Sequence, residues 1–253
     1  MFLDNIDDYA TKADALKKIY SKNCPICKGE GLVKTNKGFT NCECVTKANI
    51  HARLLCNGMP KKFLNINFND IKNNVISNKL QNFCNDIETN IFEGNNLYIY
   101  GNNKVEMMKL DCAIANELAF KKNSNGYYYN ILIVSLEELT QTILTVRNAI
   151  ELKNRLSKVM SSVDILILNY LGDESYTRTE QTAKYLTNLI TDRSFNGKLT
   201  ILSSTMLLDE ILTKYEQSFV NTLKQEFKVL KLSEVEKIEE NNIKENEFDE
   251  YYD

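Results

Sequence analysis

The sequence lacks any apolar run close to the roughly 18 to 20 residues that a helix needs to span a bilayer. It also lacks the apolar stretch of a secretory signal near its start, where MFLDNIDDYATKADALKK is acidic and then basic. Histidine is almost absent, with His51 as its one example. The missing spanning run and the missing signal stretch argue against a membrane or secreted protein, and we expect a cytoplasmic protein that has no membrane partner. The hydrophobic content of 43% is ample for a packed core.

Seven cysteines are present, and cytosolic proteins rarely use cysteine in disulfides. Four of them fall within the 21 residues CPICKGEGLVKTNKGFTNCEC, as C-x2-C, a 14-residue loop and C-x-C; they are Cys24, Cys27, Cys42 and Cys44. Two close pairs separated by a short loop place four thiolates around a tetrahedral Zn²⁺. We predict a structural zinc site, because four thiolates leave no open position at which water is activated.

Two alternatives for this cluster stay open. The second pair is C-x-C rather than C-x2-C, so His51 and Cys56 are possible substitute ligands. The second alternative is that the four residues are reduced, partly buried cysteines that hold no metal.

Charge is unevenly distributed along the chain. Residues 1–62 carry 11 Lys and Arg against 6 Asp and Glu, whereas the segment 233–253 carries 9 acids against 2 lysines. The basic part is either a contact for nucleic acid, such as single-stranded DNA, or a solvated lysine-rich surface. The acidic segment has no apolar periodicity, so we predict that it is disordered or a docking peptide.

Hydrophobic periodicity predicts alternating helices and strands. In chain order the expected elements are a helix over 5–22, a helix over 45–56, a helix over 74–92, the strand NLYIY, a helix over 105–122, the strand YNILIVS, a helix over 136–158, the strand VDILILN, a helix over 177–193, the strand KLTILSS and a helix over 207–225. Three of the strands are nearly continuous apolar runs, as in a parallel sheet with helices on both faces. The predicted fold class is α/β, with three layers around a parallel sheet.

Gly58 and Pro60 interrupt the pattern at NGMPKKF, and we place a domain boundary there. The expected organisation is an N-terminal helix and zinc-binding module over 1–57, an α/β domain over 58–232 and the acidic tail over 233–253.

The strand NLYIY is followed by GNNKVEMMKLDCAIANEL, which has the register of a phosphate-binding loop that enters a helix. Such a loop reads G-x-x-x-x-G-K-[ST]. Gly101 is retained, but Glu106, Met107 and Met108 stand in the places of the second glycine, the lysine and the hydroxyl residue. Lys104 comes three residues too early to replace that lysine. The groups that hold phosphate are therefore missing from a recognisable nucleotide site.

The strand VDILILNYLGDE shows a second loss. A working site ends this strand in acids that hold Mg²⁺ and polarise water, but here Asn169 and Tyr170 take those places, and Asp173 and Glu174 lie beyond them. The next strand ends in TILSST, where Ser204 or Thr205 presents a polar side chain at the same sheet edge. We predict a vestigial nucleotide site that binds neither ATP nor Mg²⁺.

These motifs together resemble the DnaC/DnaI/IstB-type AAA+ proteins, which are helicase loaders and transposition helper ATPases. CPICKGEG with CEC resembles the cysteine module of phage members, and GMPKKFLNINFNDI resembles the segment that leads into their ATPase domain. GNNKVEMMKLDCAIANEL, DILILNYLGDE and LITDRSFNGKLTILSST lie over the family's nucleotide motifs, so the resemblance runs from Cys24 to Leu223. It implies an AAA+-like fold. The family's arginine finger is replaced by NTL at 221–223, whereas Arg193 is retained.

The resemblance implies a catalytically degenerate, helicase-loader-like protein of a phage or other mobile element. We expect it to be a pseudo-ATPase, not an enzyme, and to act in DNA replication as an ATP-independent adaptor. Its expected partner is a replicative helicase or another AAA+ or replisome protein, bound through the N-terminal module. Three other hypotheses stay open: a decoy that joins and inhibits an active AAA+ ring, an ATPase with an atypical loop, and a zinc-dependent nucleic-acid binder.

Overall fold

The computed structural model describes residues 8–232, apart from 37, 147–148 and 173–179. The predicted acidic tail and the positions Asp173 and Glu174 lie outside the described residues. None of the described helices is long and apolar enough to cross a membrane.

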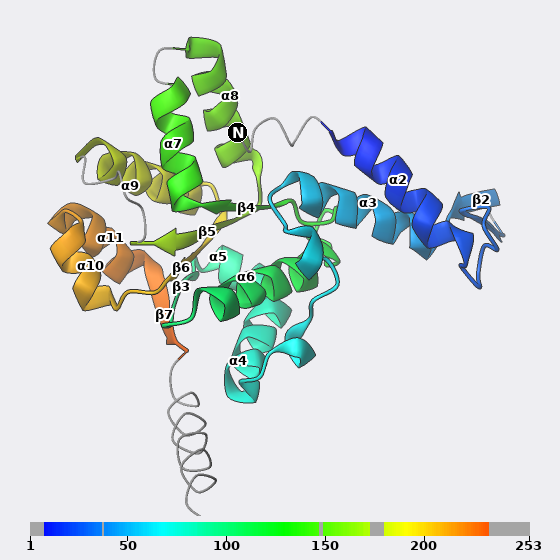
Figure 1. Cartoon of the computed structure of the whole chain (residues 1–253), viewed down its shortest axis with the longest axis horizontal. Helices are drawn as coiled ribbons and strands as arrows, with labels where there is room; N and C mark the ends of the chain where they lie inside the picture. The colour runs from blue at the N-terminus through cyan, green and yellow to red at the C-terminus, as the bar shows by residue number, and fades with distance from the viewer. Residues whose placement is uncertain (1–7, 37, 147–148, 173–179, 233–253) are drawn as a thin grey trace, which may run out of the picture.

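A five-stranded parallel sheet forms the centre of the larger part of the molecule (Figure 1). Its strands lie in the order β4-β5-β6-β3-β7, with bounds β3 Asn96–Tyr100, β4 Ile131–Ser135, β5 Ile165–Leu171, β6 Leu199–Ser204 and β7 Phe227–Lys231. The four strands predicted from the sequence are all present. The fifth, β7, is absent from the sequence prediction, because lysines interrupt the apolar residues of FKVLK and the strand lies half exposed at the sheet edge.

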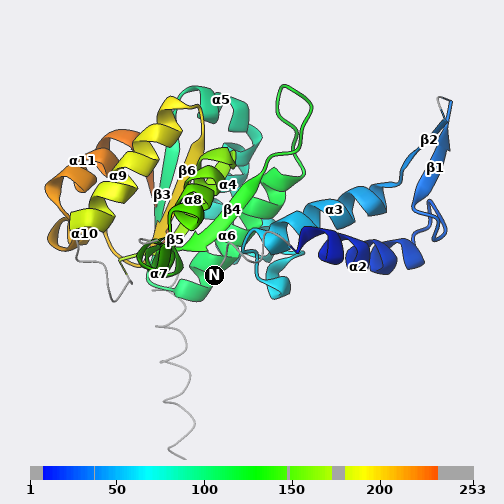
Figure 2. The ribbon, with the colours of Figure 1, turned by 90° about the horizontal axis from the view of Figure 1, so that it is seen from above.

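Alternate residues along the strands enter two separate hydrophobic cores, since successive side chains of a strand point to opposite faces. Leu97, Ile99 and Ile133 pack on one face, whereas Tyr98, Leu132 and Val134 pack on the other. The first face is covered by α4 (Asn74–Asn85), α5 (Ile87–Phe92) and α6 (Lys104–Ala119), and the second by α7 (Leu136–Val146), α8 (Ile150–Ser162), α9 (Glu180–Phe195), α10 (Leu208–Lys214) and α11 (Gln217–Glu226). This is the predicted three-layer arrangement (Figure 2).

Three helices predicted as continuous are each divided in two. The segment 74–92 forms α4 and α5, which meet at Asp86, and the segment 136–158 forms α7 and α8. The segment 207–225 forms α10 and α11, because Tyr215 and Glu216 adopt extended backbone conformations between them. Both halves of each pair pack in the same hydrophobic core, so both carry apolar residues at helical spacing. The spacing of apolar residues therefore does not show where one helix ends and the next begins.

The N-terminal part of the chain projects from the α/β body as an arm (Figures 1 and 2). We define the N-terminal arm as residues 8–49, which include α2 (Tyr9–Lys22), the antiparallel hairpin of β1 (Leu32–Thr35) and β2 (Gly38–Asn41), and the first half of α3 (Glu43–Cys56). Helices α2 and α3 lie side by side, and the hairpin lies at the end of the arm away from the body.

The second half of α3 belongs to the α/β body. Ile50 and Leu54 are buried in the same hydrophobic core as strands of the sheet. Beyond the helix, the backbone carbonyl of Asn57 accepts a hydrogen bond from the N–H of Ile133 in β4, at 2.8 Å. A Cβ at Gly58, whose φ is 90°, would lie 1.9 Å from the carbonyl oxygen of Ile133. The chain therefore contacts the edge strand at the predicted boundary, and the two 3-10 turns η1 (Lys61–Phe63) and η2 (Phe68–Asp70) continue from there.

Candidate metal centre and nucleotide-site positions

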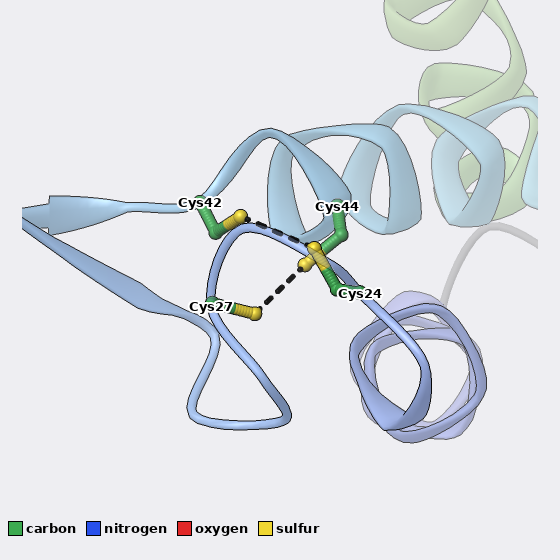
Figure 3. A group of neighbouring side chains, drawn as sticks. All are labelled: Cys24, Cys27, Cys42 and Cys44. Atoms are coloured by element: carbon green, nitrogen blue, oxygen red, sulfur yellow. Dashed lines mark hydrogen bonds between the residues drawn. The ribbon is translucent and has the colours of Figure 1, made fainter.

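The four predicted cysteine ligands lie together near the tip of the arm (Figure 3). Their sulfur atoms all lie within 4.8 Å of one another, with 3.6 Å between Cys24 and Cys42 and 3.6 Å between Cys27 and Cys44. These separations are too long for disulfide bonds, which are about 2.05 Å. They are close to the roughly 3.8 Å between sulfurs that surround a tetrahedral zinc ion with Zn–S bonds of about 2.3 Å.

Two local structures position these sulfurs. Cys24 and Cys27 belong to a tight turn in which the N–H of Lys28 donates to the carbonyl of Cys24, at 2.9 Å. Cys42 is the N-cap of α3, and Cys44 lies in the first turn of that helix. The first helical turn thus brings two cysteines separated by one residue to the same site, which explains the C-x-C spacing.

The electrostatics of the cluster fit a cation. Hydrogen bonds from the backbone N–H groups of Cys27 and Ile26 lower the pKa of Cys24 to about 6. Burial and the neighbouring thiols raise the pKa of Cys44 to about 12. Four thiolates crowded together repel one another, and a divalent ion removes their protons outright. The donor set therefore fits a closed, structural Zn²⁺ site.

The interpretation of His51 and Cys56 as substitute ligands is wrong. At 1.5 Å of rise per residue, they lie about 10 Å and about 18 Å along α3 from Cys44. Nδ1 of His51 lies 2.7 Å from the hydroxyl of Tyr20 in α2, and its ring meets Phe120 edge-on at the end of α6. Burial lowers the pKa of His51 to about 4, so the ring is neutral and joins the arm to the body.

The loop expected to cradle phosphate is replaced by helix. Strand β3 ends at Tyr100 and α6 begins at Lys104, so only residues 101–103 connect them. Glu106, Met107 and Met108, the positions compared with the end of the motif, are all helical. The side chain of Asn103 accepts hydrogen bonds from the N–H groups of Val105 at 3.0 Å and Glu106 at 3.1 Å. N–H groups of the kind that hold phosphate in a working loop are therefore satisfied within the chain.

Gly101 has a packing role here. Its N–H donates to the carbonyl of Ser204 at the end of β6, at 3.0 Å, and the N–H of Leu232 donates to the carbonyl of Tyr100, at 2.8 Å. A Cβ at Gly101 would lie 2.7 Å from the Cβ of Leu232. Leu232 thus lies directly against Gly101, the first position of the motif, where only glycine leaves room for it.

The other nucleotide-site positions contact one another. Met107 is buried in the core, and the amide nitrogen of Asn169 lies 3.7 Å from the sulfur of Met108. The side-chain carbonyl of Asn169 is buried and has no hydrogen-bond partner among the described residues. Glu106 pairs with Lys109 at 2.5 Å, within the same helix.

The remaining predicted positions complete this edge of the sheet. The ammonium group of Lys104 lies 6.0 Å from the ring centroid of Tyr170. Tyr170 has a φ of 63°, which is rare for a residue with a side chain. Thr205 is half-buried directly after β6. The residues that the sequence analysis aligns with nucleotide-binding motifs therefore lie together at the carboxyl ends of β3, β5 and β6.

Asp111 is a residue of this region that the sequence prediction does not single out. It is fully buried in α6, and one carboxylate oxygen accepts a hydrogen bond from Ser203 at 2.7 Å, while the other has no partner within the described part of the chain. Burial raises the pKa of Asp111 to about 7. The signal was available in the sequence, because an acid stands within the apolar stretch that follows Met108.

Arg193 lies at the opposite, amino-terminal edge of the sheet. Its guanidinium group is buried, and burial lowers its pKa to about 10. It donates hydrogen bonds to the carbonyls of Met160, Val163, Asp164 and Leu199 and to the hydroxyl of Thr200. Arg193 therefore joins α8, α9 and the starts of β5 and β6, and it is remote from the nucleotide-site positions.

No protein-family model matches the sequence, and a search of curated proteins finds no match either. Solved structures are similar in fold. DnaI is 22% identical, with a TM-score of 0.52, over 70% of this chain and 93% of that chain. The DnaC helicase loader is 17% identical, with a TM-score of 0.54, over 69% of this chain and 100% of that chain. DnaA bound to AMPPCP and single-stranded DNA is 16% identical, with a TM-score of 0.57, over 76% of this chain.

The chain spans only part of some of these neighbours, 58% of that DnaA chain and 54% of a DNA replication initiation factor. At these identities the comparisons establish the fold alone. The predicted α/β fold, with three layers around a parallel sheet, is confirmed.

We predict about one Zn²⁺ per purified chain, held by the four cysteines. Replacing Cys24 or Cys42 with serine should release the metal and unfold the arm, because metal binding stabilises the fold of such small sites. Elemental analysis and far-UV circular dichroism measure the two effects. Cys56→Ala is the matched control and should retain the metal. Metal-free protein purified without chelator would contradict the prediction.

Asp111 should make stability depend on pH. Its folded pKa of about 7 exceeds the value of about 3.9 in an unfolded chain. Between these values the unfolded chain loses the proton and the folded chain keeps it, so the free energy of unfolding falls as pH rises through this window. The fall is on the order of 4 kcal/mol at most. Urea unfolding at pH 5 and 8 should show Asp111→Asn gaining stability relative to the original chain at the higher pH. An equal difference at both values would refute this.

Proposed function

We propose that this chain is a catalytically degenerate, helicase-loader-like protein that serves DNA replication as an adaptor without binding ATP. The observation that carries the proposal is the filled nucleotide position, in which Asn103 occupies the helix N-terminus and Leu232 lies against Gly101. Its structural neighbours include a DnaC helicase loader and DnaI, which supports the assignment to this functional class.

The chemistry of phosphoryl transfer explains why these changes disable the site together. Such sites work by positioning and charge stabilisation, and they use a lysine, a metal with its ligands and a backbone loop. Here Met107 is buried in the core, Met108 contacts Asn169, and the loop is wound into α6. The carboxylate of Glu106 adds negative charge at the mouth of the site, where it would repel phosphate. No single substitution reverses all of these changes.

The adaptor would present its arm to a partner and use the α/β body as a rigid support. The arm projects from the body, carries the surplus of lysines and is held in shape at its tip by the zinc site. We propose a replicative helicase, or another AAA+ or replisome protein, as the partner. We further propose that the protein acts in the cytoplasm and belongs to a phage or other mobile element.

Inhibition is a second candidate function, because the body retains an AAA+-like fold without its catalytic groups. A copy that joins an active AAA+ ring as a decoy would lower the ATPase activity of the mixture. An adaptor would leave that activity unchanged or raise it, so one ATPase assay with the loader of the native host separates the two.

The melting temperature should not change with millimolar ATP and Mg²⁺, because a ligand raises it only by binding the folded state. Calorimetric titration should likewise show no saturable heat. Met107→Lys alone should not restore binding, since Glu106 and Asn169 remain and Asn103 still caps α6. A saturable shift in the original chain would instead support an ATPase with an atypical loop.

Removing residues 1–42 should abolish association with the partner. This truncation keeps the whole of α3, because Ile50 and Leu54 belong to the core of the body. The assay is a pull-down from the native host with mass spectrometry, followed by binding to the purified helicase. A chain without residues 233–253 is the control and should still bind. If the truncated chain remains folded and binds normally, the contact lies on the body instead.

A further inference from the structure

A groove of about 860 Å³ opens at the amino-terminal edge of the sheet, on the side opposite the nucleotide-site positions. The ends of α5, α9 and α11 line it, together with the loop that follows α6. Two aromatic side chains in its lining are almost fully exposed, Phe92 at 91% and Phe195 at 87%. The two phenylalanine rings give the groove large apolar surfaces that an occupant could bury.

The groove is also acidic. Glu88, Glu93 and Glu226 line it, and none of them forms an ion pair with a described lysine or arginine. A further acid, Asp164, is already paired with Lys198 at 2.8 Å. An occupant that matches this surface must carry both apolar side chains and positive charge.

The outer face of the arm hairpin has these properties. Lys34 and Phe39 are paired across the two strands and share a face with Leu32, because residues two apart along a strand point the same way. All three side chains are exposed, Phe39 at 73%. Val33 points to the other face and packs on the cysteine cluster, so the metal site holds this face in place. Lys34 supplies the positive charge on this face, and the surrounding segment 22–41 contains four lysines and one acid in all.

We propose that the hairpin face of one copy docks in the acidic groove of a second copy. The charges are complementary, both surfaces expose phenylalanine, and every copy carries one of each. Figures 1 and 2 show the hairpin at the far end of the arm, directed away from the body. The contact joins two different surfaces and is therefore heterologous, which builds open chains or closed rings rather than a two-fold dimer. This inference goes beyond the adaptor function and does not depend on it.

Sedimentation velocity tests the proposal with the full-length zinc-loaded chain over a range of micromolar concentrations. The chain should form species larger than dimers, and high salt should weaken them, because exposed charges are screened. Phe39→Ser, and separately the pair Phe92→Ser and Phe195→Ser, should weaken association by about tenfold or more, since buried aromatic side chains dominate interfaces. Ile150→Ser removes an equally exposed apolar side chain from α8 and should change nothing.

A mixing experiment tests the pairing itself. The hairpin variant and the groove variant each retain one intact surface, so a mixture should form a heterodimer and no larger species. A chain that stays monomeric at every concentration in low salt would overturn the proposal, as would variants that associate normally or a mixture without heterodimers. A further outcome is a chain that stays monomeric and binds an oligothymidine probe, which Phe39→Ser binds more weakly. In that case the hairpin binds single-stranded nucleic acid, and the proposal is wrong.

Discussion

A parallel sheet must bury both of its faces, and the rest of this structure depends on that constraint. Leu97 and Ile99 face one layer of helices while Tyr98 faces the other, so removing any covering helix would expose a core. Helix α6 is one of these covers. Its apolar side chains are required to bury this face of the sheet whether or not a nucleotide lies at its N-terminus. At this N-terminus the side chain of Asn103 accepts hydrogen bonds from two backbone N–H groups, and the side chain of Leu232 packs against Gly101.

The arm obeys a different physical rule. Its tip has a very small core, made of three buried cysteines with Val33 and Cys44 against them, and such a core stabilises a fold weakly by itself. A metal ion bound by the four cysteines would compensate, because its binding free energy adds directly to folding. The junction with the body uses ordinary packing instead: neutral His51 lies between Tyr20 and Phe120, and α3 continues into the main core. The molecule thus joins an arm, whose tip carries a donor set that fits a metal ion, to a body that is stabilised by hydrophobic burial.

This division is consistent with a protein that works through contacts. The sheet edge that carries the residues compared with a nucleotide site is packed within its own chain, and the exposed features lie elsewhere. They are the hairpin face around Phe39, which carries positive charge, and the groove around Phe92 and Phe195, which carries negative charge. A surface that exposes aromatic rings in water is kept at some cost in solubility, and a binding role explains why it is retained.

The sequence by itself determined what local spacing and periodicity can report. The cysteine spacing predicted the four sulfurs that meet at the arm tip, the apolar runs predicted four strands, and the motif register predicted which residues gather at their carboxyl ends. Tertiary structure alone decided the rest. Strand β7 lacks an apolar run because its lysines face solvent at the sheet edge, and the burial of Asp111 depends on Ser203 of a neighbouring strand. The contact of Gly101 with Leu232 depends on the order of strands in the sheet, which places residues distant in the chain side by side and leaves no periodic trace in the sequence.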